Sequence, residues 1–192
     1  MLQNEPTSSD TLRQTELSAW YRCWPRGRGY LSPAGGSAGA GRIGRETARL
    51  AEAFGARCTL STRNEPLAEL LPLADIVSLH CPLTERTHHM IDRETLRQMK
   101  GSAVLVNTAR GPVVNEHALA NALREGMIGG AAFDVYEFEP IVVDELLNLD
   151  NVVLSPHLGS ATHTTREARG VLAVDALRAV LLENRRPENA VA

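Results

Sequence analysis

The chain has 192 residues, of which 43% are hydrophobic and 22% charged, and its formal net charge is −3. This length allows one domain, or one domain with part of a second. The small acidic excess excludes the clustered basic surface of a nucleic-acid-binding protein. No apolar run reaches the length of a membrane span, so no membrane partner is expected.

The cysteines and the first residues of the chain indicate its compartment. Cys23, Cys58 and Cys81 are odd in number and form no CxxC motif, which argues against a disulfide framework. The first thirty residues lack the charged start and apolar core of a secretory signal. Together these features predict a soluble cytoplasmic protein.

Residues 1–36 show no sustained periodicity, and closely spaced prolines and glycines interrupt residues 25–36. We predict that this segment is a poorly ordered N-terminal linker or remnant. Residues 30–38 contain no apolar run, so no strand is expected there.

From residue 39 onward, short apolar runs alternate with segments of helical periodicity. Helices are expected over residues 43–54, 66–73, 93–100, 116–125 and 164–183, and strands over 57–61, 76–80, 103–106, 131–135 and 152–154. Nearly continuous apolar strands that alternate with helices are typical of a parallel sheet covered on both faces. The sequence therefore predicts the α/β class, with a Rossmann-like, doubly wound sheet.

Gly39, Gly41 and Gly44 form a GxGxxG motif at the start of the first predicted helix. In a dinucleotide-binding turn, such glycines permit the tight turn, the approach of a pyrophosphate and the close packing of helix on strand. Glycine-rich linkers produce the same pattern, and the strand expected before the motif is missing. A cofactor-binding turn and a plain linker both remain open.

The acidic residue that binds the ribose hydroxyls is expected about twenty residues after the glycine motif. The corresponding position holds Thr62, and Arg63 follows it. A missing carboxylate beside an arginine suits the 2′-phosphate of NADP; alternatively, Arg63 is a solvated loop residue. The sequence thus predicts NAD or NADP as the cofactor without deciding between them.

Arg110, Glu139 and His157 each follow one of three successive predicted strands. Ligands bind at the carboxyl ends of the strands in such sheets, so these residues are candidates for one site. Arginine binds both oxygens of a carboxylate, and histidine, oriented by a neighbouring carboxylate, transfers protons near neutral pH. These roles suit reduction of a 2-keto acid. Taken singly, each residue also has a purely structural interpretation, such as a surface ion pair or a loop contact.

The remaining histidines show no metal-ligand spacing with carboxylates or thiols, and no metal site is predicted from them. They are His80, His88, His89, His117 and His163.

Several long segments resemble the D-isomer-specific 2-hydroxyacid dehydrogenases, a family that includes glyoxylate and hydroxypyruvate reductases, phosphoglycerate dehydrogenase and formate dehydrogenase. The segments, in family order, are GRIGRETARLAEAFG, ADIVSLHCPLTERTHHMID, KGSAVLVNTARGPVVNEHALANAL, GAAFDVYEFEP and NVVLSPHLGSATHTTREA. The resemblance covers nearly everything from Gly39 to the C-terminus. It implies an NAD(P)-dependent oxidoreductase acting on the CH–OH group of a small D-2-hydroxy acid, as in the reduction of glyoxylate or hydroxypyruvate.

The same resemblance implies a role for each matching residue. Arg110 would bind the substrate carboxylate and keto oxygen, His157 would be the general acid/base, and Glu139 would be its partner. The implied cofactor contacts are Arg42 and Ile43 at the pyrophosphate, Cys81, Pro82 and Thr87 on the adenosine side, Thr108 and Ala109 at the nicotinamide end, Asp134 at the carboxamide and Gly159 near the nicotinamide ribose.

The chain also departs from the family pattern. Family members carry a substrate domain ahead of the glycine turn, where this chain has 38 residues, and residues 63–75 are too few for the family's usual helix and strand. We therefore expect a dinucleotide-binding domain over residues 37–162, a helix over 163–192 that would pack on a substrate domain, and a substrate domain that is largely missing. The resemblance further implies a homodimer formed through the nucleotide-binding domain.

Three hypotheses for function follow from the motifs and the departures. The first is a reductase of small 2-keto acids. The second is a non-catalytic NAD(P)-binding module or an inactive fragment of such an enzyme. The third is a chain whose substrate domain is supplied by a separate polypeptide.

Overall fold

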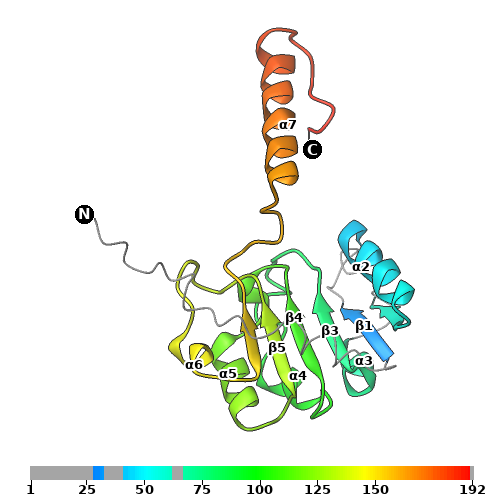
Figure 1. The fold of residues 1–192 in the computed structure, drawn as a ribbon, viewed down its shortest axis with the longest axis vertical. Coiled ribbons are helices and arrows are strands. Elements are labelled where there is room, and N and C mark those ends of the chain that lie inside the picture. The colour runs from blue at the N-terminus through cyan, green and yellow to red at the C-terminus, as the bar shows by residue number, and fades with distance from the viewer. Residues whose placement is uncertain (1–27, 33–40, 62–66, 191–192) are drawn as a thin grey trace, which may run out of the picture. The chain divides into compact units, whose positions relative to one another are not determined.

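The computed structural model describes residues 28–32, 41–61 and 67–190. The chain forms two compact units, residues 1–156 and 157–192. In the first unit, parallel strands form one sheet with the order β2-β1-β3-β4-β5-β6 (Figure 1). The strands are β1 Arg28–Ser32, β2 Arg57–Leu60, β3 Ile76–Leu79, β4 Val104–Asn107, β5 Gly130–Phe133 and β6 Val152–Leu154.

The helices of the first unit connect these strands, and capping residues or glycines mark some of their ends. They are α2 Arg42–Ala53, α3 Leu67–Leu70, η2 Leu71–Leu73, α4 Arg93–Arg97, η3 Gly111–Val113, α5 Glu116–Arg124 and α6 Asp144–Leu147. Side chains of Asp92 and Asn115 accept hydrogen bonds from the first turns of α4 and α5, the usual role of Asp and Asn at a helix N-cap. Gly55 and Gly126, which follow α2 and α5, have φ of 88° and 68°, as expected of helix stops.

Strand β1 corrects the expectation that no strand precedes the glycine turn. Its sequence, RGYLS, contains too few apolar residues to predict a buried strand. The strand forms nevertheless, because its backbone pairs with neighbours on both sides: Tyr30 is in register with Thr59 of β2 and with Val77 of β3. The expected linker therefore includes a central strand of the sheet. The rest of residues 1–36 lies outside the described residues.

The strand order confirms a doubly wound sheet. From β1 the chain proceeds to β2 at one edge, whereas β3 to β6 extend from β1 toward the other edge. Since βαβ crossovers are right-handed, the two directions place α2 on one face of the sheet and α4 and α5 on the other. The direction changes between β1 and β3, and sheets of this kind bind ligands at that switch point.

The core of the first unit consists of apolar side chains from the central strands and from the helices that pack on them. Leu79, Ile91, Leu105 and Leu119 are fully buried. Residues 67–75 form α3 and η2 before β3 begins.

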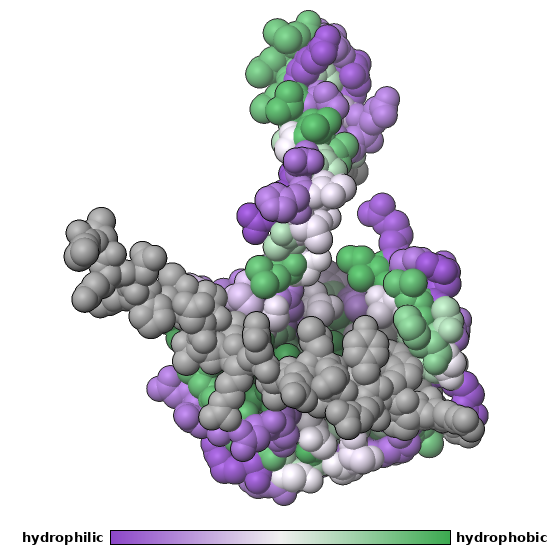
Figure 2. Space-filling model, in the orientation of Figure 1, coloured by the Kyte–Doolittle hydropathy of each residue, from purple (hydrophilic) through white to green (hydrophobic). Residues whose placement is uncertain are grey.

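The second unit contains α7, His163–Leu181. Thr162 is its N-cap, and the Thr162 hydroxyl accepts a hydrogen bond from the Thr165 amide. Apolar side chains lie on the surface of this helix (Figure 2), and Val171 and Val180 are more than half exposed. None of the helices in the described residues is long and apolar enough to cross a membrane.

Glu116, the first residue of α5, carries a buried carboxylate in this core. Its Oε1 accepts a hydrogen bond of 2.6 Å from the Glu137 amide, and its Oε2 is buried with no hydrogen-bond partner among the described residues. Burial raises the pKa of the Glu116 carboxyl; the Glu137 amide opposes this rise, and the Glu137 carboxylate adds to it. The ionised side chain therefore costs folding free energy.

Glu116→Gln should stabilise the protein above mildly acidic pH. A raised pKa in the folded state means that stability is lost as the pH rises from the ordinary value of 4.5 through the folded pKa. Glutamine keeps the acceptor for the Glu137 amide without the charge, so we expect a gain of about 1 kcal/mol at pH 7.5 and a smaller gain at pH 4.5. Thermal melts at both pH values measure this difference. Glu94→Gln, at an exposed position, is the control, and destabilisation by Glu116→Gln at pH 7.5 would contradict the prediction.

Candidate active site

The predicted site residues of the first unit follow the carboxyl ends of its strands. Cys81 and Pro82 come soon after β3, Thr108 directly follows β4, and Asp134 directly follows β5. In a parallel sheet these ends lie on one edge, so the structure places these residues along the same edge. Gly39, Thr62 and Arg63 lie outside the described residues, and their predicted roles stay predictions.

The N-terminus of α2 is suited to an anion. Gly41 is its N-cap in extended conformation, with no side-chain cap, and the first turn holds no acidic residue. Its amides and the helix dipole therefore favour a negatively charged ligand. Gly44 is buried while Arg42 and Ile43 are exposed, and α2 packs on β1 and β2. The buried Gly44 lets α2 pack closely on these strands, and the cofactor roles of the glycines stay predictions.

Thr87, a predicted cofactor contact, holds the loop after β3 together. Thr87 is fully buried, and its hydroxyl donates to the Pro82 carbonyl (2.7 Å) while accepting from the Thr84 amide (2.7 Å). The hydroxyl thus holds the loop together internally. At the start of the loop, burial raises the pKa of the Cys81 thiol to about 11, so this residue acts as an apolar wall rather than a reactive thiolate.

Asn107, which the sequence analysis does not single out, fixes the turn that carries Arg110. Its side chain is fully buried; Oδ1 accepts from the Ala109 amide and Nδ2 donates to the Arg110 carbonyl, both at 3.0 Å. The Arg110 side chain is exposed, with Nη1 donating to the Ala109 carbonyl. The buried Asn107 amide therefore acts as a clamp on the backbone of this turn, and Arg110 is exposed at the end of β4. The only sequence signal for it is the polar residue that ends the apolar run VLVN.

The glycine after Arg110 is required by the backbone of the neighbouring loop. A Cβ on Gly111 would lie 1.9 Å from the carbonyl carbon and oxygen of Tyr136 and 2.4 Å from the Glu137 nitrogen. Real Cβ atoms do not approach backbone atoms this closely. The loops after β4 and β5 therefore pack backbone to backbone, which places Arg110 and Glu139 on neighbouring loops.

Glu139 lies in a turn that is anchored to the end of β6. Its Oε1 accepts a hydrogen bond of 3.0 Å from the Tyr136 amide, and the Tyr136 hydroxyl donates to the Ser155 carbonyl at 2.8 Å. Burial raises the pKa of the Tyr136 hydroxyl, so it remains a neutral donor. The glutamate side chain itself is exposed.

His157 and Gly159 belong to the second unit, which His157 begins. His157 has a φ of 55°, the left-handed region that is uncommon for residues other than glycine. Both residues are exposed. The pairing of Glu139 with His157 stays a prediction.

The sequence matches the model of a known family, described as D-isomer specific 2-hydroxyacid dehydrogenase, NAD binding domain, over residues 8–159. The chain belongs to this family. The match begins at residue 8, well ahead of residue 37, where the sequence analysis places the start of the domain. It thus includes the strand β1 that the sequence analysis misses.

Relatives and solved structures agree with this family. The chain is 49% identical to a glyoxylate reductase of Korarchaeum cryptofilum over 77% of its length and 49% of that protein. A Thermus thermophilus structure is similar with a TM-score of 0.75 and 44% identity, covering 86% of this chain and 54% of the other. An NADPH-dependent glyoxylate/hydroxypyruvate reductase of Sinorhizobium meliloti, solved with NADP and malonate, is similar with a TM-score of 0.74 and 33% identity. This match covers 87% of this chain and 57% of the other. The chain therefore spans about half the length of the relatives that it matches.

Proposed function

We propose that this chain is the dinucleotide-binding part of an NAD(P)-dependent reductase of small 2-keto acids such as glyoxylate or hydroxypyruvate. The observation that supports this proposal most directly is the turn after β4: the buried Asn107 amide fixes its backbone, and Arg110, whose guanidinium donates to the Ala109 carbonyl, is exposed there. A guanidinium in this position suits the carboxylate of a substrate. The glyoxylate reductases among the relatives support this substrate class.

Three side chains would divide the reaction between them. Arg110 would bind the substrate carboxylate and orient the keto carbon toward the nicotinamide. The cofactor, when bound, supplies the hydride to that carbon. His157 would donate a proton to the keto oxygen, and Glu139 would orient the imidazole. Hydride and proton together convert the 2-keto acid to the 2-hydroxy acid.

The cofactor would bind across the switch point between β1 and β3. Its pyrophosphate would meet the N-terminus of α2, and the loop from Cys81 to Thr87 would line the adenosine side. A relative solved with NADP and the Thr62–Arg63 pair favour acceptance of a 2′-phosphate. Calorimetric titration with NADH and NADPH tests this site, and Arg63→Ala should weaken NADPH binding more than NADH binding.

The exposed apolar side chains of α7, which include Val171 and Leu172 at 59% and 53% exposure, suggest a partner for this helix. We propose that α7 packs on a substrate domain and that the first unit forms a homodimer. Size-exclusion chromatography with light scattering distinguishes monomer from dimer. The cytoplasmic location expected from the sequence likewise stays a prediction.

A second candidate function is a nucleotide-binding module without catalysis. It is favoured by the family match, which is to the NAD-binding domain of the family over residues 8–159. Binding a dinucleotide alone does not require a second domain that excludes water from a substrate.

Turnover and binding together separate the two functions. Oxidation of NADH and NADPH is measured with glyoxylate, hydroxypyruvate and pyruvate, and the reductase hypothesis expects turnover with at least one of them. Tight dinucleotide binding without turnover supports the module. Absence of both binding and turnover contradicts both proposals.

A further inference from the structure

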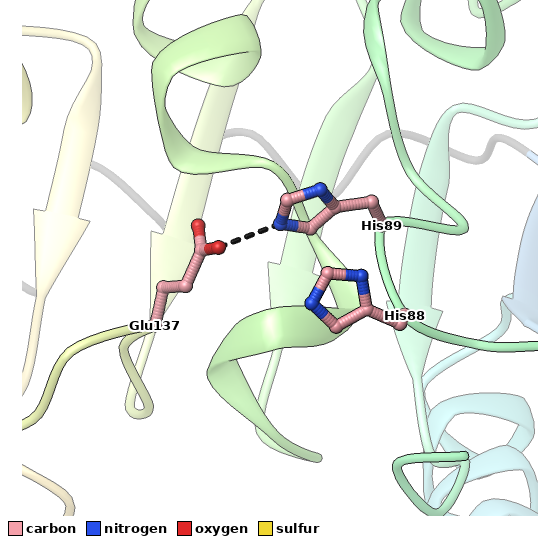
Figure 3. Close-up of side chains that lie close together, drawn as sticks. All are labelled: His88, His89 and Glu137. Carbon is pink, nitrogen blue, oxygen red and sulfur yellow. Dashed lines mark hydrogen bonds and ion pairs between the residues drawn. The ribbon is translucent and has the colours of Figure 1, made fainter. Parts of the chain in front are cut away.

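Two histidines that the sequence analysis sets aside meet a carboxylate from a distant part of the chain. His88 and His89 lie in the loop after β3, and Glu137 lies in the loop after β5 (Figure 3). One ligand atom from each residue lies within 4.8 Å of the other two. The sequence hides this cluster because 48 residues separate His89 from Glu137.

The backbone at His89 brings both rings to one side. Adjacent residues of an extended chain point in opposite directions, but His89 has a φ of 49°. Hydrogen bonds from the His89 amide to the Pro112 carbonyl (2.8 Å) and from the Met90 amide to the Thr87 carbonyl (3.2 Å) hold this conformation. As a result the ring centroids lie 4.1 Å apart, and both rings face Glu137 (Figure 3).

We propose that His88, His89 and Glu137 form a binding site for a divalent transition-metal ion, with Zn²⁺ as the ion that fits the donors best. Two imidazoles and one carboxylate are a recurrent set of protein ligands for Zn²⁺. Such a set is less suited to Mg²⁺ or Ca²⁺, which take oxygen ligands. Water would complete the coordination on the exposed side of His88.

The distances are compatible with a shared ion. At metal–ligand bond lengths of about 2.1 Å, tetrahedral ligand atoms lie roughly 3.4 Å apart. His89 Nε2 and Glu137 Oε1 are 2.6 Å apart, the length of a bond through a shared proton. Replacing that proton with the ion requires a separation larger by less than about 1 Å, and the exposed His88 ring can rotate to join them.

The second nitrogen of His89 leaves its Nε2 available. Its Nδ1 lies 3.5 Å from Nδ2 of Asn115, at the long limit of hydrogen bonding. This contact is too weak to require a lone pair on Nδ1, so the ring can carry its proton there and present Nε2 to the ion.

The charge behind the cluster also favours a cation. The amide of Glu137 donates to the fully buried Glu116 carboxylate at 2.6 Å. The Glu116 carboxylate is therefore bonded to the backbone of the same residue whose side chain is the second carboxylate. The Glu137 side chain is itself only 12% exposed. A divalent ion would balance both charges. The proposed ligands include none of Arg110, Glu139 and His157, so the proposal does not depend on the dehydrogenase function.

Titration of the EDTA-treated, desalted chain with Zn²⁺ alone tests the site, with Co²⁺ absorption as a second readout of histidine ligation. We expect about one equivalent of Zn²⁺ to bind, and His88→Ala and Glu137→Gln each to weaken binding at least about tenfold. His88 is exposed, so its replacement leaves the fold intact. His117→Ala is the matched control, because His117 faces Glu145 at 3.4 Å as an exposed histidine–carboxylate pair and should bind Zn²⁺ like the wild type.

Three results would overturn the assignment. They are the absence of Zn²⁺ binding to the wild type, wild-type affinity in both His88→Ala and Glu137→Gln, and an equal loss in His117→Ala. Dinucleotide binding is measured on the same variants, so failure of this site is distinguished from failure of the proposed enzyme function.

Discussion

Gly111→Ala should destabilise the protein by about 3 kcal/mol or more, which corresponds to a fall in melting temperature of roughly 10 °C for a chain of this size. The added Cβ would overlap the Tyr136 carbonyl group at 1.9 Å and approach the Glu137 nitrogen at 2.4 Å. These are backbone atoms, so no side-chain rotation relieves the overlap. The loops after β4 and β5 would have to separate.

Separating these loops should also affect ligand binding. Gly111 follows Arg110 directly, and the Tyr136 amide is the donor to Glu139. Thermal melts and dinucleotide titrations of the variant are compared with those of Gly101→Ala, where an added Cβ meets nothing within 4 Å. If the melting temperature of Gly111→Ala lies within about 2 °C of that of Gly101→Ala, the free energies of unfolding differ by only about 0.5–1 kcal/mol. That result would show that the two loops do not pack as described.

Most of the fold follows from local signals in the sequence. Apolar runs predict β3 to β6, and capping residues such as Asp92 and Asn115 predict where α4 and α5 begin, because each signal lies within a few residues of the structure that it specifies. Strand β1 lacks such a signal. Its central position depends on backbone pairing with β2 and β3, which are 25 or more residues away, so no local pattern predicts it.

The candidate site divides in the same way. Arg110, Glu139 and His157 are named as candidates because each follows a strand in the sequence, and their joint role stays a prediction. The residues that support them are not recognised in the sequence. Asn107 is recognised as a clamp only when the turn after β4 is seen, and the contact between His89 and Glu137 exists only because the loops after β3 and β5 lie side by side.

His157→Asn should lower the turnover of 2-keto acids by about 10²–10⁴-fold, the usual contribution of a general acid. Asparagine resembles the imidazole in size and hydrogen bonding but does not release a proton near neutral pH. The loss should therefore appear in kcat, with little change in the KM of the keto acid, because Arg110 would still bind its carboxylate. NADH oxidation with glyoxylate, measured across a range of pH, gives both the rate and its pH dependence.

The pH dependence separates a chemical role of His157 from a structural one. A variant that merely loosens the segment after β6 lowers the rate at every pH, whereas loss of the proton donor also removes the limb of the pH profile that belongs to the imidazole. His163→Asn, at another exposed histidine of the second unit, should retain both the rate and the profile. An undiminished rate in His157→Asn would exclude His157 as the proton donor and leave Arg110 and the cofactor turn as the parts of the proposed site still to be tested.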